Sequence, residues 1–115
     1  MMDVERVAAQ RLKEALKVPV YLEVPANRPE EFVTVELTGS SIDGGFVLHA
    51  SLAVQSWAAT RRRAAEIARA VVAAVPSIAD EPNVFKAEGD GFYRWPDPDS
   101  GSPRYQTNVE LAICE

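Results

Sequence analysis

The chain has 115 residues, of which 47% are hydrophobic and 25% are charged, and its formal net charge is -5. This length and composition indicate one globular domain, residues 1–115. The chain has seventeen acidic and twelve basic residues. Because Lys and Arg normally drive nucleic-acid binding, we do not expect tight binding of nucleic acid. No apolar run approaches the roughly 20 residues of a membrane span, so we expect no membrane partner. The single cysteine, Cys114, allows no intrachain disulfide.

The first half of the chain predicts one helix followed by three strands. Asp3 is a favourable N-cap, and apolar residues then recur at helical spacing to residue 17, before Pro19. Residues 18–24, 32–38 and 47–57 alternate between apolar and other side chains, which is typical of strands that bury one face. The segment 39–45 is rich in Gly and Ser and predicts a turn.

The second half predicts another helix and two more strands. Thr60 can cap a helix whose apolar stripe ends before Pro76, and residues 77–83 predict a loop. A strand over 84–95 is interrupted by a bulge at residues 89–91, and the last strand covers 104–113. The order α-β-β-β-α-β-β, with short connections, predicts an α+β two-layer sandwich. We expect a mostly antiparallel sheet of about five strands with two helices on one face.

The segment 92–106 is the most informative part of the sequence, because it holds four of the nine aromatic residues and three of the eight prolines. An aromatic strand enters, a Pro/Asp/Ser/Gly turn reverses the chain, and a second strand leaves. The aromatic side chains alternate in sidedness, so some must lie on the open sheet face or at the tip. Either the hairpin folds over its own domain, or it forms an interface, for which exposed Trp, Tyr and Arg are typical. We favour an interface made by Phe92, Tyr93, Arg94, Trp95, Asp97, Asp99 and Arg104.

Three consecutive arginines, Arg61, Arg62 and Arg63, occupy the first turn of the second predicted helix. Each cation opposes the helix dipole at that position. One interpretation is a solvated face in which at least one arginine packs by its stem. The other is a salt-bridging patch that meets an acidic surface on another chain, which a homo-oligomer of this acidic protein could supply. The sequence leaves both interpretations open.

No set of residues makes a convincing catalytic, cofactor or metal site. His49 shares a predicted strand face with Ser51, but no recognisable motif surrounds either residue. The segment 97–101 is similar to the start of a calcium loop, yet its glycine comes one position early and Asn108 stands where a bidentate Glu is needed. We therefore expect no enzyme. The enzyme alternative is a metal-assisted hydrolase that uses the two carboxylates of this loop.

Four parts of the chain, taken in order, carry a family resemblance. They are the helix that starts at residues 2–5, the segments 24–29 and 32–36, the segment 52–58 before the Ala-rich helix, and residues 92–106, where the similarity is closest. In this order they resemble the small tail-terminator, or tail-completion (head-tail joining), proteins of long-tailed bacteriophages and prophages. The resemblance covers nearly the whole chain and depends on the order of the segments.

The resemblance implies an α+β fold, no catalysis and a structural role in virion assembly. Such proteins assemble as a ring, usually of six subunits, that caps the head-proximal end of the tail tube, stops its polymerisation and faces the head connector. It thus implies three partners: the chain itself, the tail-tube protein and the head connector. The location would be the virion tail or neck, and the host cytoplasm during assembly. Alternatives are a head-tail connector or neck subunit, and a small α+β ligand-binding or regulatory domain with an apolar pocket and no ring.

Overall fold

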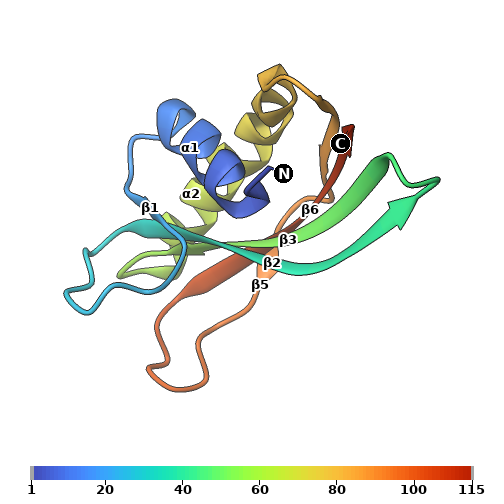
Figure 1. Ribbon diagram of the computed structural model, residues 1–115. Coiled ribbons are helices and arrows are strands. Elements are labelled where there is room, and N and C mark those ends of the chain that lie inside the picture. The colour runs from blue at the N-terminus through green and yellow to red at the C-terminus, as the bar shows by residue number, and fades with distance from the viewer. Residues whose placement is uncertain (1, 115) are drawn as a thin grey trace.

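Two helices lie on one face of a mostly antiparallel sheet in the computed structural model, which describes residues 2–114 (Figure 1). This arrangement confirms the predicted α+β sandwich. The helical elements are α1 (Val4–Ala15), α2 (Arg61–Ala74) and the 3-10 helix η1 (Val75–Asp80). The strands are β1 (Val20–Tyr21), β2 (Phe32–Asp43), β3 (Val47–Trp57), β4 (Val84–Gly89), β5 (Tyr93–Arg94) and β6 (Arg104–Cys114).

The sheet has the order β1-β2-β3-β6-β4, and β5 also pairs with β6. β2 and β3 form a long antiparallel hairpin, and β3 pairs antiparallel with β6 along its whole length. The first part of β6 pairs with β5 and its later part with β4. The short β1 is the exception, because it pairs parallel with β2. β3 and β6 are therefore the central strands.

The core lies between the sheet and the helices, where the alternating apolar residues of the strands meet the apolar stripes of α1 and α2. Inward residues such as Leu52 and Val54 of β3 and Val109 of β6 are at most 1% exposed, as the alternation predicts. Each helix begins at the predicted cap: Asp3 accepts a hydrogen bond from the amide of Arg6, and Thr60 from that of Arg63. The helices contribute Val4, Ala8, Leu12, Ala64, Ile67, Ala68 and Val71 to the buried set.

The sequence predicts a turn over 39–45, whereas β2 continues to Asp43 and pairs with β3 as far as Val47. The reversal is confined to residues 44–46, where Gly44 and Gly45 have φ angles of 62° and 80° that glycine adopts without steric cost. A register shift between Leu37 and Gly39 bends the hairpin. The outer part of the β2–β3 hairpin, residues 38–49, projects beyond the helices (Figure 1), and we call it the arm.

Other boundaries differ for local reasons. α1 ends at Ala15 instead of residue 17, and residues 75–80 form η1 where the end of α2 and a loop are predicted. The predicted strand 18–24 is reduced to two residues. Leu22 and Val24 are 37% and 45% exposed, so the later part of this segment does not form a strand with one buried face. The predicted strand 84–95 is divided into β4 and β5 near the predicted bulge. Within residues 2–114, no helix is long and apolar enough to cross a membrane.

Replacing Leu52 by alanine is expected to lower the free energy of unfolding by about 3 kcal/mol, because the change leaves a cavity under the helices. The matched control is Ile42→Ala, an apolar position on the same face of the sheet that is 66% exposed. The control is expected to stay within about 0.5 kcal/mol of the parent chain. Urea unfolding followed by circular dichroism measures both, and equal losses would contradict this placement of the core.

Candidate assembly surfaces

The hairpin between β5 and β6, residues 93–106, ends in a capped turn. The backbone amide of Trp95 donates a hydrogen bond to the carbonyl of Arg104 at 2.8 Å. At the tip, the Asp97 carboxylate accepts hydrogen bonds from the amides of Asp99 and Ser100, both at 3.3 Å, and from the Ser100 hydroxyl. The carboxylate that the metal-hydrolase alternative requires is therefore engaged in a local turn. Among residues 2–114, no group of three or more His, Cys, Asp or Glu side chains could hold a metal ion.

Arg104 lies inside the fold and positions the hairpin, although the sequence places it among the partner-facing residues. Only 9% of the surface of this residue is exposed to solvent. Its Nε atom donates to the backbone carbonyl of Trp95 at 2.7 Å, and its guanidinium carbon lies 4.9 Å from the ring centroid of Trp57. Both contacts join the hairpin to the end of β3. Arg104 therefore holds the neighbouring aromatic residues in place instead of presenting its own charge.

A cluster around Trp57 is the feature that the sequence analysis missed. The Trp57 ring stacks on Phe32 with a centroid distance of 5.2 Å, and the guanidinium carbon of Arg28 lies 4.8 Å from the Trp57 centroid. The indole Nε1 donates to the Thr34 hydroxyl at 3.1 Å. The alternation places Trp57 on the polar face of β3, but it gives no sign of the cations that cover its ring. The cluster joins the start of β2 to the end of β3 at this end of the sheet.

The hairpin aromatics divide between the two faces, as their alternation predicts. Tyr93 and Trp95 are 39% and 51% exposed and meet edge to face at 6.0 Å. Phe92 and Tyr105 form a separate edge-to-face pair at 5.8 Å. Phe92 also lines a 480 Å³ groove together with residues of α2, which places it on the helix side. Tyr93 and Trp95 are thus the ring systems of the hairpin that solvent, or a partner, can reach most easily.

The three arginines at the start of α2 have different roles. The Nε and Nη2 atoms of Arg63 lie 2.6 and 3.1 Å from the two carboxylate oxygens of Glu31, and Nη1 lies 3.4 Å from Glu66. The hydrogen bonds with Glu31 are the main reason that the pKa of Arg63 is raised above its ordinary value. Arg61 and Arg62 are exposed and form no ion pair with any residue in the range 2–114. Arg63 is therefore paired within its own chain, and only Arg61 and Arg62 are left for the interface interpretation, which stays a prediction.

Four exposed arginines gather where β2 begins and β3 ends. Arg28 precedes β2, Arg61 and Arg62 follow β3, and Arg94 pairs in β5 with a residue near the start of β6. None of them forms an ion pair within the described chain. We call this group the cationic end. It lies at the opposite end of the sheet from the arm (Figure 1).

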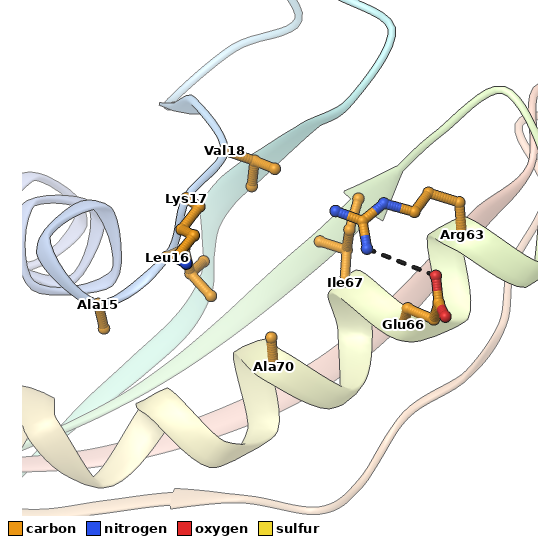
Figure 2. A pocket seen from close by; sticks show the side chains of 8 residues that line it. All are labelled: Ala15, Leu16, Lys17, Val18, Arg63, Glu66, Ile67 and Ala70. Carbon is orange, nitrogen blue, oxygen red and sulfur yellow. Dashed lines mark hydrogen bonds and ion pairs between the residues drawn. The ribbon is translucent and has the colours of Figure 1, made fainter.

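A groove of 270 Å³ lies between the end of α1 and α2 (Figure 2). Its apolar lining includes Leu16, Val18 and Ile67, and the Arg63–Glu66 ion pair lies along one side. This volume falls just below the roughly 300–1,000 Å³ that is usual for small-molecule sites. Arg63 and Glu66 already satisfy each other, so these two residues provide few free polar groups for a ligand.

His49 and Ser51 do not form a nucleophile–base pair. The Ser51 hydroxyl donates to both carboxylate oxygens of Glu110 at 2.9 Å. The Nε2 atom of His49 lies 4.0 Å from Asp43 on the neighbouring strand of the arm. Each side chain therefore contacts a different carboxylate, and neither is arranged to activate the other.

The chain matches no known protein-family model, and a search of the curated proteins finds no match. By its fold and its surfaces, the protein is a small α+β domain with a rigid aromatic hairpin, a projecting arm and a cationic end.

Replacing Arg104 by alanine is expected to lower the free energy of unfolding by about 2 kcal/mol, because a charged hydrogen bond and a cation–π contact are lost together. The matched control is Arg94→Ala in the same hairpin, where the side chain is exposed and the expected change is within about 0.5 kcal/mol. Urea unfolding followed by tryptophan fluorescence reports on both Trp57 and Trp95. A loss from Arg94→Ala as large as that from Arg104→Ala would show that Arg104 does not act as a clamp.

The turn at the hairpin tip is expected to weaken in acid. The Ser100 hydroxyl, followed by the amides of Asp99 and Ser100, holds the pKa of Asp97 below its ordinary value of 3.8. A lowered pKa in the folded state stabilises the turn above about pH 4, and this contribution is lost as the pH falls through the folded pKa. A carboxyl-carbon NMR titration of Asp97 measures the shift, and Ser100→Ala is expected to reduce it. An Asp97 pKa at or above its ordinary value in the parent chain would refute the contact.

Proposed function

We propose that the protein is the subunit of a ring that caps the tail tube of a long-tailed bacteriophage or prophage, stops its polymerisation and joins it to the head. The ordered resemblance of four segments supports this class of protein. The α+β class that the resemblance implies agrees with the two helices and mostly antiparallel sheet of the chain. The exposed aromatic hairpin next to the cationic end is the observation that carries the assembly role.

This surface suits a protein–protein contact for two physical reasons. Trp, Tyr and Arg are the residues most enriched at the energetic centres of interfaces. Trp95 and Tyr93 lie on a hairpin that Arg104 already holds in place, so little conformational freedom remains to be lost on binding.

The charge of the surface favours a ring over a two-fold dimer. In a two-fold dimer the same patch meets its own copy, so the unpaired arginines of the cationic end would face one another and repel. A ring uses a heterologous contact, in which this patch meets a different patch on the neighbour. The acidic balance of the chain elsewhere provides such surfaces. A net charge of -5 per subunit also suits a lumen through which DNA slides without tight binding.

The first test is native mass spectrometry over a concentration series, with and without the tail-tube protein of the same virus. We expect a closed ring, of about six subunits, either alone or on the tube. A monomer or dimer that ignores the tube protein would contradict the proposed function and favour a ligand-binding domain, for which the groove of Figure 2 is the place to screen.

Two variants test whether the aromatic hairpin and the cationic end make the ring contact. Trp95→Ala and the double change Arg61→Glu/Arg62→Glu are each expected to weaken assembly by at least about 30-fold while unfolding changes by less than about 0.5 kcal/mol. Arg63 is left intact because its contact with Glu31 belongs to the fold. The matched controls are Phe85→Ala, which is 61% exposed on β4, and Lys13→Glu/Lys17→Glu. Rings unaffected by both test variants would show that the contact lies elsewhere.

A further inference from the structure

A second surface lies at the opposite end of the molecule, between the start of α1 and the arm. It is a groove of 380 Å³. On the arm, Ile42 pairs with Leu48 and Ser40 with Ala50, so these side chains lie on one face of the hairpin. The helices do not cover this part of the sheet (Figure 1), and Ile42 is 66% exposed. The apolar lining consists of Met2, Val4, Leu37, Ile42, Leu48 and Ala50.

The charged residues of this groove are acidic. Asp3 and Glu5 line it, and among residues 2–114 no Lys or Arg does, although Arg6 forms an exposed ion pair with Asp3 at 3.5 Å. One carboxylate oxygen of Glu5 accepts a 2.7 Å hydrogen bond from the amide of Leu37, which fixes the carboxylate at the bend of the arm. Asp43 is not part of this groove, because it lies on the other face of the arm with its carboxylate 4.0 Å from His49. The groove thus combines an apolar floor with negative charge at its rim.

The molecule is therefore bipolar along its length. Its largest extent is 43 Å, against 25 Å in the other two directions, and β3 runs from the arm to the cationic end. One end presents arginines without ion pairs beside the exposed ring of Trp95, and the other presents carboxylates around an uncovered apolar groove. The two ends are complementary in charge, and each offers apolar surface to the other. A patch that repels its own copy but attracts the opposite end specifies head-to-tail association.

We propose that the groove between α1 and the arm binds the cationic end of the next copy of this chain. The apolar floor receives the aromatic hairpin around Trp95, and the arginines lie near Asp3 and Glu5. The contact is a property of the chain itself, and its place in a closed ring rests on the proposed function.

The test uses two variants that damage different halves of the contact. Ile42→Asp places a charge in the groove and leaves the cationic end intact, whereas Arg61→Glu/Arg62→Glu reverses the cationic end and leaves the groove intact. Each is expected to weaken self-association by at least about 30-fold, the effect of losing one interface hot spot. Phe85→Asp, an equally exposed apolar position outside both surfaces, is the control and is expected to assemble like the parent chain.

The decisive measurement mixes the two variants in equal amounts, above the concentration at which the parent chain assembles. One intact groove and one intact cationic end are then available, so sedimentation velocity and native mass spectrometry should show a one-to-one heterodimer and no larger species. Circular dichroism and urea unfolding confirm that each variant is folded, and Leu37→Ser replaces Ile42→Asp if it is not.

The outcomes separate this contact from the proposed function. Two results would overturn the contact and leave the ring intact. In the first, the parent chain forms rings but the mixture of the two variants stays monomeric. In the second, the Ile42→Asp variant still forms rings. A heterodimer from the mixture together with open filaments of the parent chain would support the contact and overturn the capping ring. A parent chain that never self-associates, even with tube protein, would overturn both.

Discussion

The contacts of Arg104 determine where the aromatic hairpin of the molecule lies. A buried guanidinium is costly unless hydrogen bonds and aromatic rings replace its water, and here the Trp95 carbonyl and the Trp57 ring do so. The cation thereby joins three parts of the chain: the end of β3, the start of β6 and the segment after β5 that carries Trp95. The hairpin is consequently an extension of the sheet and not a free loop. The same junction places the hairpin at the end of the sheet where β3 ends and α2 begins.

The parts of the fold that sequence reasoning recovers are those in which one local signal dominates. Residues 47–57 and 104–113 alternate so regularly that each has one possible buried face, and Asp3 and Thr60 mark both helix starts. The arm is different, because Gly39, Ser40 and Ser41 are typical turn residues. Their strand conformation comes from pairing with residues 49–51, so the partner strand outweighs local preference. Window-based reasoning cannot include a partner that lies on the other side of a turn.

The surfaces could be predicted in part, for a similar reason. Alternation correctly divides Tyr93 and Trp95 from Phe92 and Tyr105, because sidedness in a strand is local. Whether an arginine is available is not local. Arg63 is neutralised by Glu31, and Arg104 is covered by Trp57, and both partners are distant in the sequence. The groove beside α1 could not be anticipated, since Ser40 and Ile42 of its wall fall in the segment that the sequence assigns to a turn.

A chain with two different and complementary ends has a simple physical reason to assemble, and a reason to stop. Every free subunit exposes apolar surface at Ile42 and at Trp95, and burying both requires two neighbours. A linear oligomer always leaves one groove and one cationic end exposed to water, whereas a closed ring leaves none. Closure then depends on the angle between the two ends of the subunit. The bend near Gly39 sets the direction of the arm, and the Arg104 junction independently sets that of the hairpin. If the proposed contact is correct, changes that straighten the bend should alter the size of the assembly more than its affinity.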